Sequence, residues 1–487
     1  MAQFDKEIVS GNVFRSIWKV AWPVIITQLV AGIHGIIDHI LIGRYVGYEG
    51  QGAVGVSWQL FLVVVVFISS LFHGMNILIA RYSGKQDRDS VSRIFYNTLL
   101  TALYIQAFLL APGGWLLTPQ ALELVDVDPA IKEHALPYMR LLFTGSTPLF
   151  LMFIVAGALQ SSGNPKIPMF LGILTTVTNV VLSYVLITGA FGLPEMGTLG
   201  AAIGTAFGPL PSVLIALGLI LNRRVLITFP SRKTLFPDLS IIREVSRIGV
   251  PSGIQAVLLN VGGAILIYFI NQLPDGKEAI AAYTVCYAQI FSVITWTGFG
   301  LRAACATVMG QNIGAGEIDR GKRAVYMGAG IAFAWALFFG IFYWTIPHTI
   351  LGWFSLTSEP LVEEIATELL RYLAFSGLLV AVTLAFTGGL QGAGDTKKPM
   401  YIAFITQIVI LLGICYVFLQ VGRLSTTVIW SAILIGHASR LTLSYAAFLH
   451  GGWKNIKVEI QPDSEPDGDV AAVKKPDGPP EPDAPSA

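Results

Sequence analysis

Twelve stretches of the chain are apolar and long enough to cross a lipid bilayer as helices. The hydrocarbon core of a bilayer requires about 20 apolar residues of helix. The predicted spans are residues 16–43, 53–80, 93–115, 135–162, 167–190, 198–222, 247–273, 280–309, 323–346, 366–391, 399–421 and 425–449. The sequence therefore predicts an all-α polytopic membrane protein with twelve transmembrane helices.

The composition agrees with a membrane environment. Of the 487 residues, 54% are hydrophobic and only 13% are charged, whereas soluble domains carry roughly 25% charged residues. So few charges would not cover the surface of a soluble protein. The three cysteines, Cys286, Cys305 and Cys415, lie in separate apolar stretches, which indicates packing residues rather than a disulfide framework or a metal site.

The distribution of Lys and Arg predicts which ends of the helices face the cytoplasm. With the N-terminus in the cytoplasm, 23 of the 31 Lys and Arg residues fall in cytoplasmic segments and four fall on the opposite side. The positive-inside rule therefore predicts a multi-pass protein of the plasma (inner) membrane with both termini in the cytoplasm. The first apolar run is longer than that of a cleavable signal, so this span is expected to stay in the mature protein.

An internal duplication divides the chain into two halves. Residues 157–169 read GALQSSGNPKIPM and residues 388–400 read GGLQGAGDTKKPM, which are identical at seven of thirteen positions. Six spans in each half return the chain to its starting side, so both halves must have the same orientation. The duplication predicts two six-helix lobes related by a pseudo-twofold axis near the membrane normal, as in secondary transporters.

Duplication and composition together predict five segments. The C-terminal stretch QPDSEPDGDVAAVKKPDGPPEPDAPSA is rich in Pro and Asp and has no apolar periodicity, so it is predicted to be disordered. The segments are a cytoplasmic N-terminus (1–15), an N-lobe (16–222), a cytoplasmic linker (223–246), a C-lobe (247–450) and a disordered cytoplasmic tail (451–487).

The sequence argues against several classes of function. It has no complete nucleotide-binding signature and no basic patch interleaved with aromatic residues, so neither a nucleotide nor a nucleic acid is a predicted partner. It also has no paired acids, no nucleophile with a base and no cluster of metal ligands. The chain is therefore not predicted to be an enzyme, and no cofactor is expected. Energy for transport would come from an ion gradient or from none.

The order and duplication of the motifs resemble the multidrug and toxic compound extrusion (MATE) family. The resemblance rests on the six plus six spans, the repeated LQ-x-x-G-x-x-x-x-P and the first-span pattern P-x14-D-x4-G-x3-G, formed here by Pro23, Asp38, Gly43 and Gly47. It covers approximately residues 12–450. It implies two lobes around a central cleft and export of small amphipathic, often cationic organic compounds, driven by an H+ or Na+ gradient.

Within this family the polar residues resemble the DinF-like branch more than the NorM-like branch. The NorM-like branch places a glutamate in the seventh span, where this chain has Leu259, and an aspartate in the tenth span, which here has none. The DinF-like branch has an Asp, an N-x-x-x-D and a Thr in the first, fifth and sixth spans. Asp38, Asn179 and Thr205 match, but Ser183 replaces the second aspartate. The resemblance therefore implies Asp38 as the single acidic coupling residue.

Asp38 lies in the apolar stretch AGIHGIIDHILIG of the first span. A carboxylate inside a membrane is functional by default, so we expect Asp38 to bind and release a proton; the alternative is a structural buried acid. His34 lies one helical turn earlier on the same face. It holds the carboxylate by a hydrogen bond, relays protons, or completes a structural pair. Pro23, Gly32 and Gly35 predict places where this span flexes.

Three further polar residues lie inside predicted spans. Asn179 and Ser183 share one face of the fifth span and either complete a polar cluster with Asp38 and Thr205 or hold helices together. Arg302 lies in the eighth span, within GFGLRAACATVMG. We interpret it as a charge that lines the cleft, where it would disfavour cationic compounds.

The function predicted from these observations is a proton-coupled, or Na+-coupled, antiporter for amphipathic organic compounds. Its predicted partners are that small substrate and membrane lipid, and the chain is predicted to be a monomer. Two alternatives stay open. A flippase for lipid-linked precursors would carry several basic residues in the cleft, and a passive channel or sensor would carry a polar pore through the whole membrane.

Overall fold

The structure is a computed structural model that describes residues 4, 6–125, 127–230 and 235–460. Residues 461–487 of the predicted tail lie outside the described residues, as do parts of the predicted N-terminus and linker. The described residues form helices, turns and extended connections, without a β-strand. The helices of the first half are α1 (Lys6–Ser10), α2 (Val13–Tyr45), α3 (Tyr48–Gly84), α4 (Arg88–Tyr104), η1 (Ile105–Leu110), α5 (Ala111–Leu124), α6 (Pro129–Gly145), α7 (Thr147–Ser161), α8 (Lys166–Thr188), η2 (Ala190–Gly192), α9 (Thr198–Phe207) and α10 (Leu210–Leu221). The helices of the second half are α11 (Leu239–Asn271), α12 (Gly276–Tyr283), η3 (Thr284–Ile290), α13 (Ser292–Gly314), α14 (Ile318–Thr345), α15 (Pro347–Gly352), η4 (Leu356–Ser358), α16 (Pro360–Gly392), α17 (Lys397–Ala403), η5 (Phe404–Leu412), α18 (Gly413–Gln420), α19 (Thr426–His450) and η6 (Gly452–Asn455).

Eleven helical stretches among the described residues are long and apolar enough to cross a membrane by themselves. The pair α6 and α7, bent by 48°, makes a twelfth. The bend follows from the sequence, because Pro148 at the start of α7 has no backbone N–H with which to continue the hydrogen-bond ladder of α6. The predicted all-α architecture with twelve spans is confirmed.

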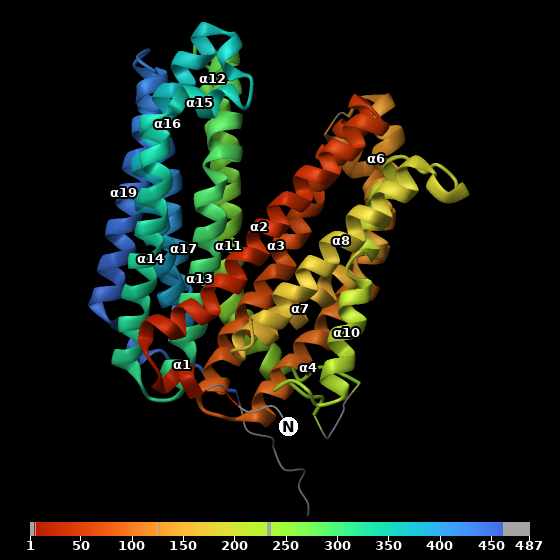
Figure 1. The fold of residues 1–487 in the computed structure, drawn as a ribbon, viewed down its shortest axis with the longest axis vertical. Helices are drawn as coiled ribbons and strands as arrows, with labels where there is room; N and C mark the ends of the chain where they lie inside the picture. Colours follow the sequence, from red (N-terminus) through yellow and green to blue (C-terminus); the bar gives the residue numbers. More distant parts are fainter. Residues whose placement is uncertain (1–3, 5, 126, 231–234, 461–487) are drawn as a thin grey trace, which may run out of the picture.

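The helices gather into two lobes that meet at one end of the molecule and diverge toward the other, as Figure 1 shows. Most of the N-lobe is built from α2–α10 and most of the C-lobe from α11–α19. The lobes meet where α3 and α13 end, at Gly84 and Gly314. We call this the closed end. It carries the Lys- and Arg-rich loops that predict the cytoplasmic side.

The first halves of α2 and α11 pack in the lobe opposite to that of their second halves. Ile17 and Val20 of α2 belong to the hydrophobic core of the C-lobe, whereas Ile42 belongs to that of the N-lobe. In α11, Val245 belongs to the N-lobe core and Leu266 to the C-lobe core. Because α2 and α11 open the two halves of the duplicated sequence, this reciprocal crossing is what a pseudo-twofold axis requires.

Helix α1 ties the first half of α2 to the C-lobe. Arg320 of α14 donates hydrogen bonds to the carbonyl oxygens of Gly11 and Ile8, at 2.6 and 3.1 Å. Lys19 of α2 donates to the Glu7 carboxylate at 2.8 Å, and this hydrogen bond lowers the pKa of the Glu7 carboxyl. These contacts fix α2 against the C-lobe at the closed end.

Residues 451–460 form a strap from the C-lobe to the N-lobe at the closed end, in which the short helix η6 is followed by irregular chain at 456–460. Trp453 is buried in the C-lobe core, whereas Val458 and Ile460 are buried in the N-lobe core. The Ile460 N–H also donates to the Tyr82 hydroxyl at 2.8 Å. The sequence analysis assigned these residues to the tail, but their apolar side chains alternate with exposed ones, and the apolar ones pack against both lobes.

We expect Val458→Asp to open the closed end. A carboxylate in the N-lobe core without a partner costs several kcal/mol, so the strap should detach and the fraction of molecules open at this end should rise more than about tenfold. Distances between spin labels at the exposed positions Arg224 and Glu317, measured by pulsed electron resonance, report the opening. Lys457→Asp is the control, because Lys457 is exposed on the same strap. Equal opening by both variants would show that burial of Val458 in the strap does not hold the closed end shut.

Candidate functional site

Asp38 and His34 form a pair on one face of α2. The Nε2 atom of His34 lies 3.3 Å from Oδ2 of Asp38, and the two side chains are 23% and 15% exposed. The other carboxylate oxygen of Asp38, Oδ1, is buried and has no hydrogen-bond partner among the described residues. One oxygen is therefore held by His34, and the other is available to a proton or a cation.

Tyr138 of α6 lies near both Asp38 and the sixth span. Its side chain is 3% exposed and is close enough to interact with both the Thr205 hydroxyl of α9 and the Asp38 carboxylate. A phenol hydroxyl both donates and accepts a hydrogen bond. The structure thus brings Asp38 and Thr205 around a residue that the sequence analysis did not consider.

Asn179 and Ser183 are fully buried on the face of α8 that contacts α9. A Cβ atom on Gly204 would lie 2.0 Å from the Ser183 Oγ, and one on Gly208 would lie 2.8 Å from the Asn179 Cβ. In the part of the chain that the structure describes, the amide oxygen and nitrogen of Asn179 and the Ser183 Oγ have no hydrogen-bond partner. These side chains do not hold α8 and α9 together by hydrogen bonds, so the close helix contact comes from the glycines.

Of the predicted flexing positions in α2, Pro23 lies inside a continuous helix. Gly32 packs closely against the C-lobe, since a Cβ atom there would lie 2.3 Å from the Trp296 ring of α13. Gly35 has no neighbouring atom within 4 Å of such a Cβ. The contact with Trp296 explains why a residue without a side chain stands at position 32. The bending of α2 at these positions stays a prediction.

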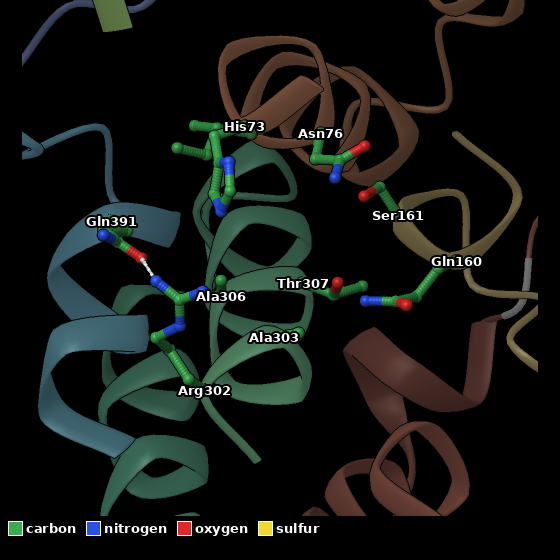
Figure 2. Close-up of a pocket in the computed structure, with 10 residues that line it drawn as sticks. His73, Asn76, Gln160, Ser161, Arg302, Ala303, Ala306, Thr307 and Gln391 are labelled. Carbon is green, nitrogen blue, oxygen red and sulfur yellow. Dashed lines mark hydrogen bonds between the residues drawn. The ribbon is translucent and has the colours of Figure 1, made fainter. Parts of the chain in front are cut away.

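A pocket with a cavity of about 80 Å³ lies between the lobes. Its lining comes from α3 and α7 of the N-lobe and from α13 and α16 of the C-lobe, and Figure 2 shows the side chains around it. The lining residues are His73, Asn76, Ile77, Gln160, Ser161, Arg302, Ala303, Ala306, Thr307 and Gln391. Ligand pockets for whole drug-sized molecules are several times larger, so this cavity fits one chemical group.

Arg302 is the charged residue of this pocket. Its Nη1 donates to the Oε1 of Gln391 at 3.4 Å, and the Gln391 amide in turn donates to Gln255 of α11 at 3.1 Å. The guanidinium lies 5.4 Å from the centre of the Phe299 ring. Its Nε is buried without a hydrogen-bond partner. The prediction placed Arg302 in the cleft, and in the structure it lines a pocket shared by both lobes.

The sequence analysis missed other ionisable residues inside spans. His73 of α3 points into the pocket beside Arg302, as Figure 2 shows. Arg440 of α19 donates to Thr406 at 3.0 Å and to Gln407 at 2.8 Å. The signal for both was in the sequence, because any ionisable residue inside an apolar span is a candidate for function.

The comparisons with known proteins give the family. The sequence model of one family, MatE, matches residues 23–185 and 251–417. The chain belongs to the MatE family. The "Probable multidrug resistance protein NorM" of Thermotoga maritima is 26% identical over 449 residues, which cover 91% of this chain and 94% of that protein. The "Probable multidrug resistance protein YoeA" of Bacillus subtilis is 25% identical, over 92% of this chain and 96% of that protein.

Two solved structures have the same fold. An outward-facing multidrug resistance transporter of the MATE family aligns with a TM-score of 0.83 at 20% identity, over 92% of this chain and 98% of that one. A MOP superfamily transporter from Pyrococcus furiosus aligns with a TM-score of 0.84 at 19% identity, over 92% of this chain and 98% of that one. They agree with the predicted two-lobe architecture.

Membership of the MatE family makes this chain a transporter and not an enzyme. The two matched ranges fall in the two halves of the chain, one for each repeat of the duplicated sequence. Transporters of the MatE family draw on ion gradients without a bound cofactor. Within the described part of the chain, no group of three His, Cys, Asp or Glu side chains could hold a metal ion.

Proposed function

We propose that this MatE protein is a secondary active antiporter that exports amphipathic organic compounds in exchange for H+, with Asp38 as the coupling residue. The observation that carries the proposal is the half-satisfied Asp38 carboxylate, 15% exposed inside a span, with one buried oxygen unpartnered. Its relatives are named as multidrug resistance proteins, which supports an organic substrate.

The residues around Asp38 favour H+ over Na+. A proton needs one carboxylate oxygen, whereas a sodium ion is held by several oxygen ligands. Ser183 stands where the DinF-like branch has a second aspartate, so Asn179, Ser183 and Thr205 supply only neutral oxygens. This donor set also supports placing the chain near the DinF-like branch, although several relatives carry the name NorM.

Alternating access requires a second state in which the closed end opens and the diverging ends meet. We propose that the closed end faces the cytoplasm of the plasma (inner) membrane, with both termini on that side, because its loops carry most of the Lys and Arg residues. The form in Figure 1 is then the outward-facing state of a monomer. Pro23, Gly32 and Gly35 are the proposed flexing points of α2 between the two states.

Transport into inverted membrane vesicles tests the coupling. A panel of fluorescent amphipathic compounds, cationic, zwitterionic and anionic, is offered while a pH gradient and a Na+ gradient are imposed one at a time. We expect a pH gradient alone to drive accumulation of at least one compound. Accumulation driven only by Na+ would contradict the proposed coupling ion, and equal distribution under both gradients would indicate a passive channel.

A further inference from the structure

The pocket between the lobes contains a cation with unused hydrogen-bond donors. A guanidinium carries five N–H donors and no acceptor. The described residues give Arg302 one long hydrogen bond, to the neutral amide of Gln391, while its Nε is buried and unpartnered. No carboxylate of the described residues lies within 4 Å of it as an ion pair. Arg302 is half-buried, and a charge partly withdrawn from water in this way is stabilised when a counter-charge binds to it.

The rest of the pocket adds neutral polar groups and no acid. His73 donates a hydrogen bond from Nδ1 to the Ser69 carbonyl oxygen at 2.7 Å, so Nε2 of the neutral ring is an acceptor and gives no hydrogen bond to an oxyanion. Asn76 and Thr307 present an amide and a hydroxyl, which donate readily to an oxyanion. A pocket lined by one cation and neutral polar groups, without an acid, attracts an anionic group and repels a cationic one.

We propose that this pocket binds the carboxylate or other oxyanion of a transported amphipathic compound, with Arg302 as its principal ligand. The inference rests on the proposed transport function and names its substrate class. Arginine suits the task because its planar fork matches the two oxygens of a carboxylate.

The size and position of the pocket fit one end of such a compound. A cavity of about 80 Å³ accommodates an acidic group but not an amphipathic body. Phe299, 37% exposed and 5.4 Å from Arg302, offers an aromatic surface to the apolar part. A bound oxyanion touches α13 and α16 of one lobe and α3 and α7 of the other, so its occupancy depends on how the lobes are arranged.

The acidic group and the coupling proton use separate sites. Asp38 does not line this pocket, and its neighbours Tyr138 and Thr205 belong to α6 and α9. A compound with a negative charge can therefore bind at Arg302 without competing for the proton at Asp38. The predicted preference is for acidic or zwitterionic compounds over simple organic cations.

The test is an equilibrium binding measurement on the purified full chain in neutral detergent, using the fluorescence of dansyl-phenylalanine and of its methyl ester. These probes differ by one negative charge. Wild type should bind the acid at least about tenfold more tightly than the ester, and Arg302→Gln should remove that preference. Arg302→Lys should keep part of it, because it keeps the charge and loses the fork. Arg140→Gln, the same change at an arginine that stacks on Trp115, should keep all of it.

Equal binding of acid and ester by wild type would overturn the proposal without any variant, and so would an undiminished acid preference in Arg302→Gln. A further arm adds an anionic phospholipid to the micelles. If the phospholipid displaces the acid from wild type, but does not displace the residual acid that Arg302→Gln binds, the oxyanion belongs to a lipid and the transported-compound assignment is wrong. No ion gradient is present in these measurements. A failure here is therefore distinguishable from a failure of proton coupling in vesicles.

Discussion

Asp38→Asn is expected to abolish proton-driven transport, with accumulation in inverted vesicles falling more than about a hundredfold to the level of empty vesicles. Asparagine keeps the shape of the side chain and its contact with His34, but it cannot bind and release a proton at neutral pH. Binding of the organic compound should persist, because Asp38 does not line the pocket between the lobes. Uptake under an imposed pH gradient and equilibrium binding measure the two effects separately.

Asp275→Asn is the matched control for this prediction. Asp275 is exposed in the turn between α11 and α12, and its side chain makes no capping hydrogen bond. The same chemical change there should leave transport at the wild-type level. If Asp38→Asn folds and transports as well as Asp275→Asn, Asp38 is a structural acid, and the coupling group must be sought among His73, Arg302 and the second lobe.

The number and class of the helices could be predicted because each span carries its own signal. A run of about 20 apolar residues has no other stable place than a bilayer or a large core. The predicted ends were less accurate: the third span was placed at 93–115, whereas the helical stretch runs over Arg88–Leu124. Its outer turns contain charged and polar residues that a hydropathy scan excludes but that helix geometry tolerates.

The crossing of α2 and α11 between the lobes could not be predicted. Whether Ile17 packs against α13 or against another helix of its own half depends on surfaces distant in the sequence, and hydropathy is the same in either case. The strap at 451–460 was missed for a related reason. It has too few apolar residues to be recognised as a structural element. Its burial depends on packing against the cores of both lobes, which are distant in the sequence.

The polar residues were predicted in part. Asp38 and His34 were paired by helix periodicity, and the structure places them 3.3 Å apart. Helix periodicity could not predict that Tyr138 lies near Asp38, because Tyr138 belongs to another span and tyrosine is common in packing roles. Likewise, the pocket that His73 and Arg302 share could not be predicted, because it forms only where α3 and α13 meet in the folded protein.

The closed end is held by close helix contacts at glycines. A Cβ atom on Gly249 of α11 would lie 1.9 Å from the Ser70 carbonyl oxygen of α3, and one on Gly74 would lie 2.0 Å from the Val245 carbonyl oxygen. The contact of α3 with α13 has the same character, since a Cβ atom on Gly84 would lie 1.9 Å from the Gln311 carbonyl oxygen. Small residues let these backbones touch. Because the first half of α11 packs in the N-lobe, the contact that joins the two lobes is that of α3 with α13.

Gly84→Val is therefore expected to prevent the closed end from closing. The added side chain meets backbone rather than a flexible side chain, so α3 and α13 must separate, at a cost near the upper end of the roughly 1–3 kcal/mol typical of overpacking. The opposite state, in which this end is open, loses nothing. Its population should rise about a hundredfold, and transport should fall by more than about tenfold because the cycle can no longer pass through the form in Figure 1.

Gly55→Val is the matched control, because Gly55 also lies on α3 and a Cβ atom there would meet nothing within 4 Å. Spin labels at Arg224 and Glu317 should move apart in Gly84→Val and stay at the wild-type distance in Gly55→Val. If both variants keep the wild-type distance and rate, contacts other than the glycines hold this end together. The strap and α1 would then be the elements that determine which end of the transporter is open.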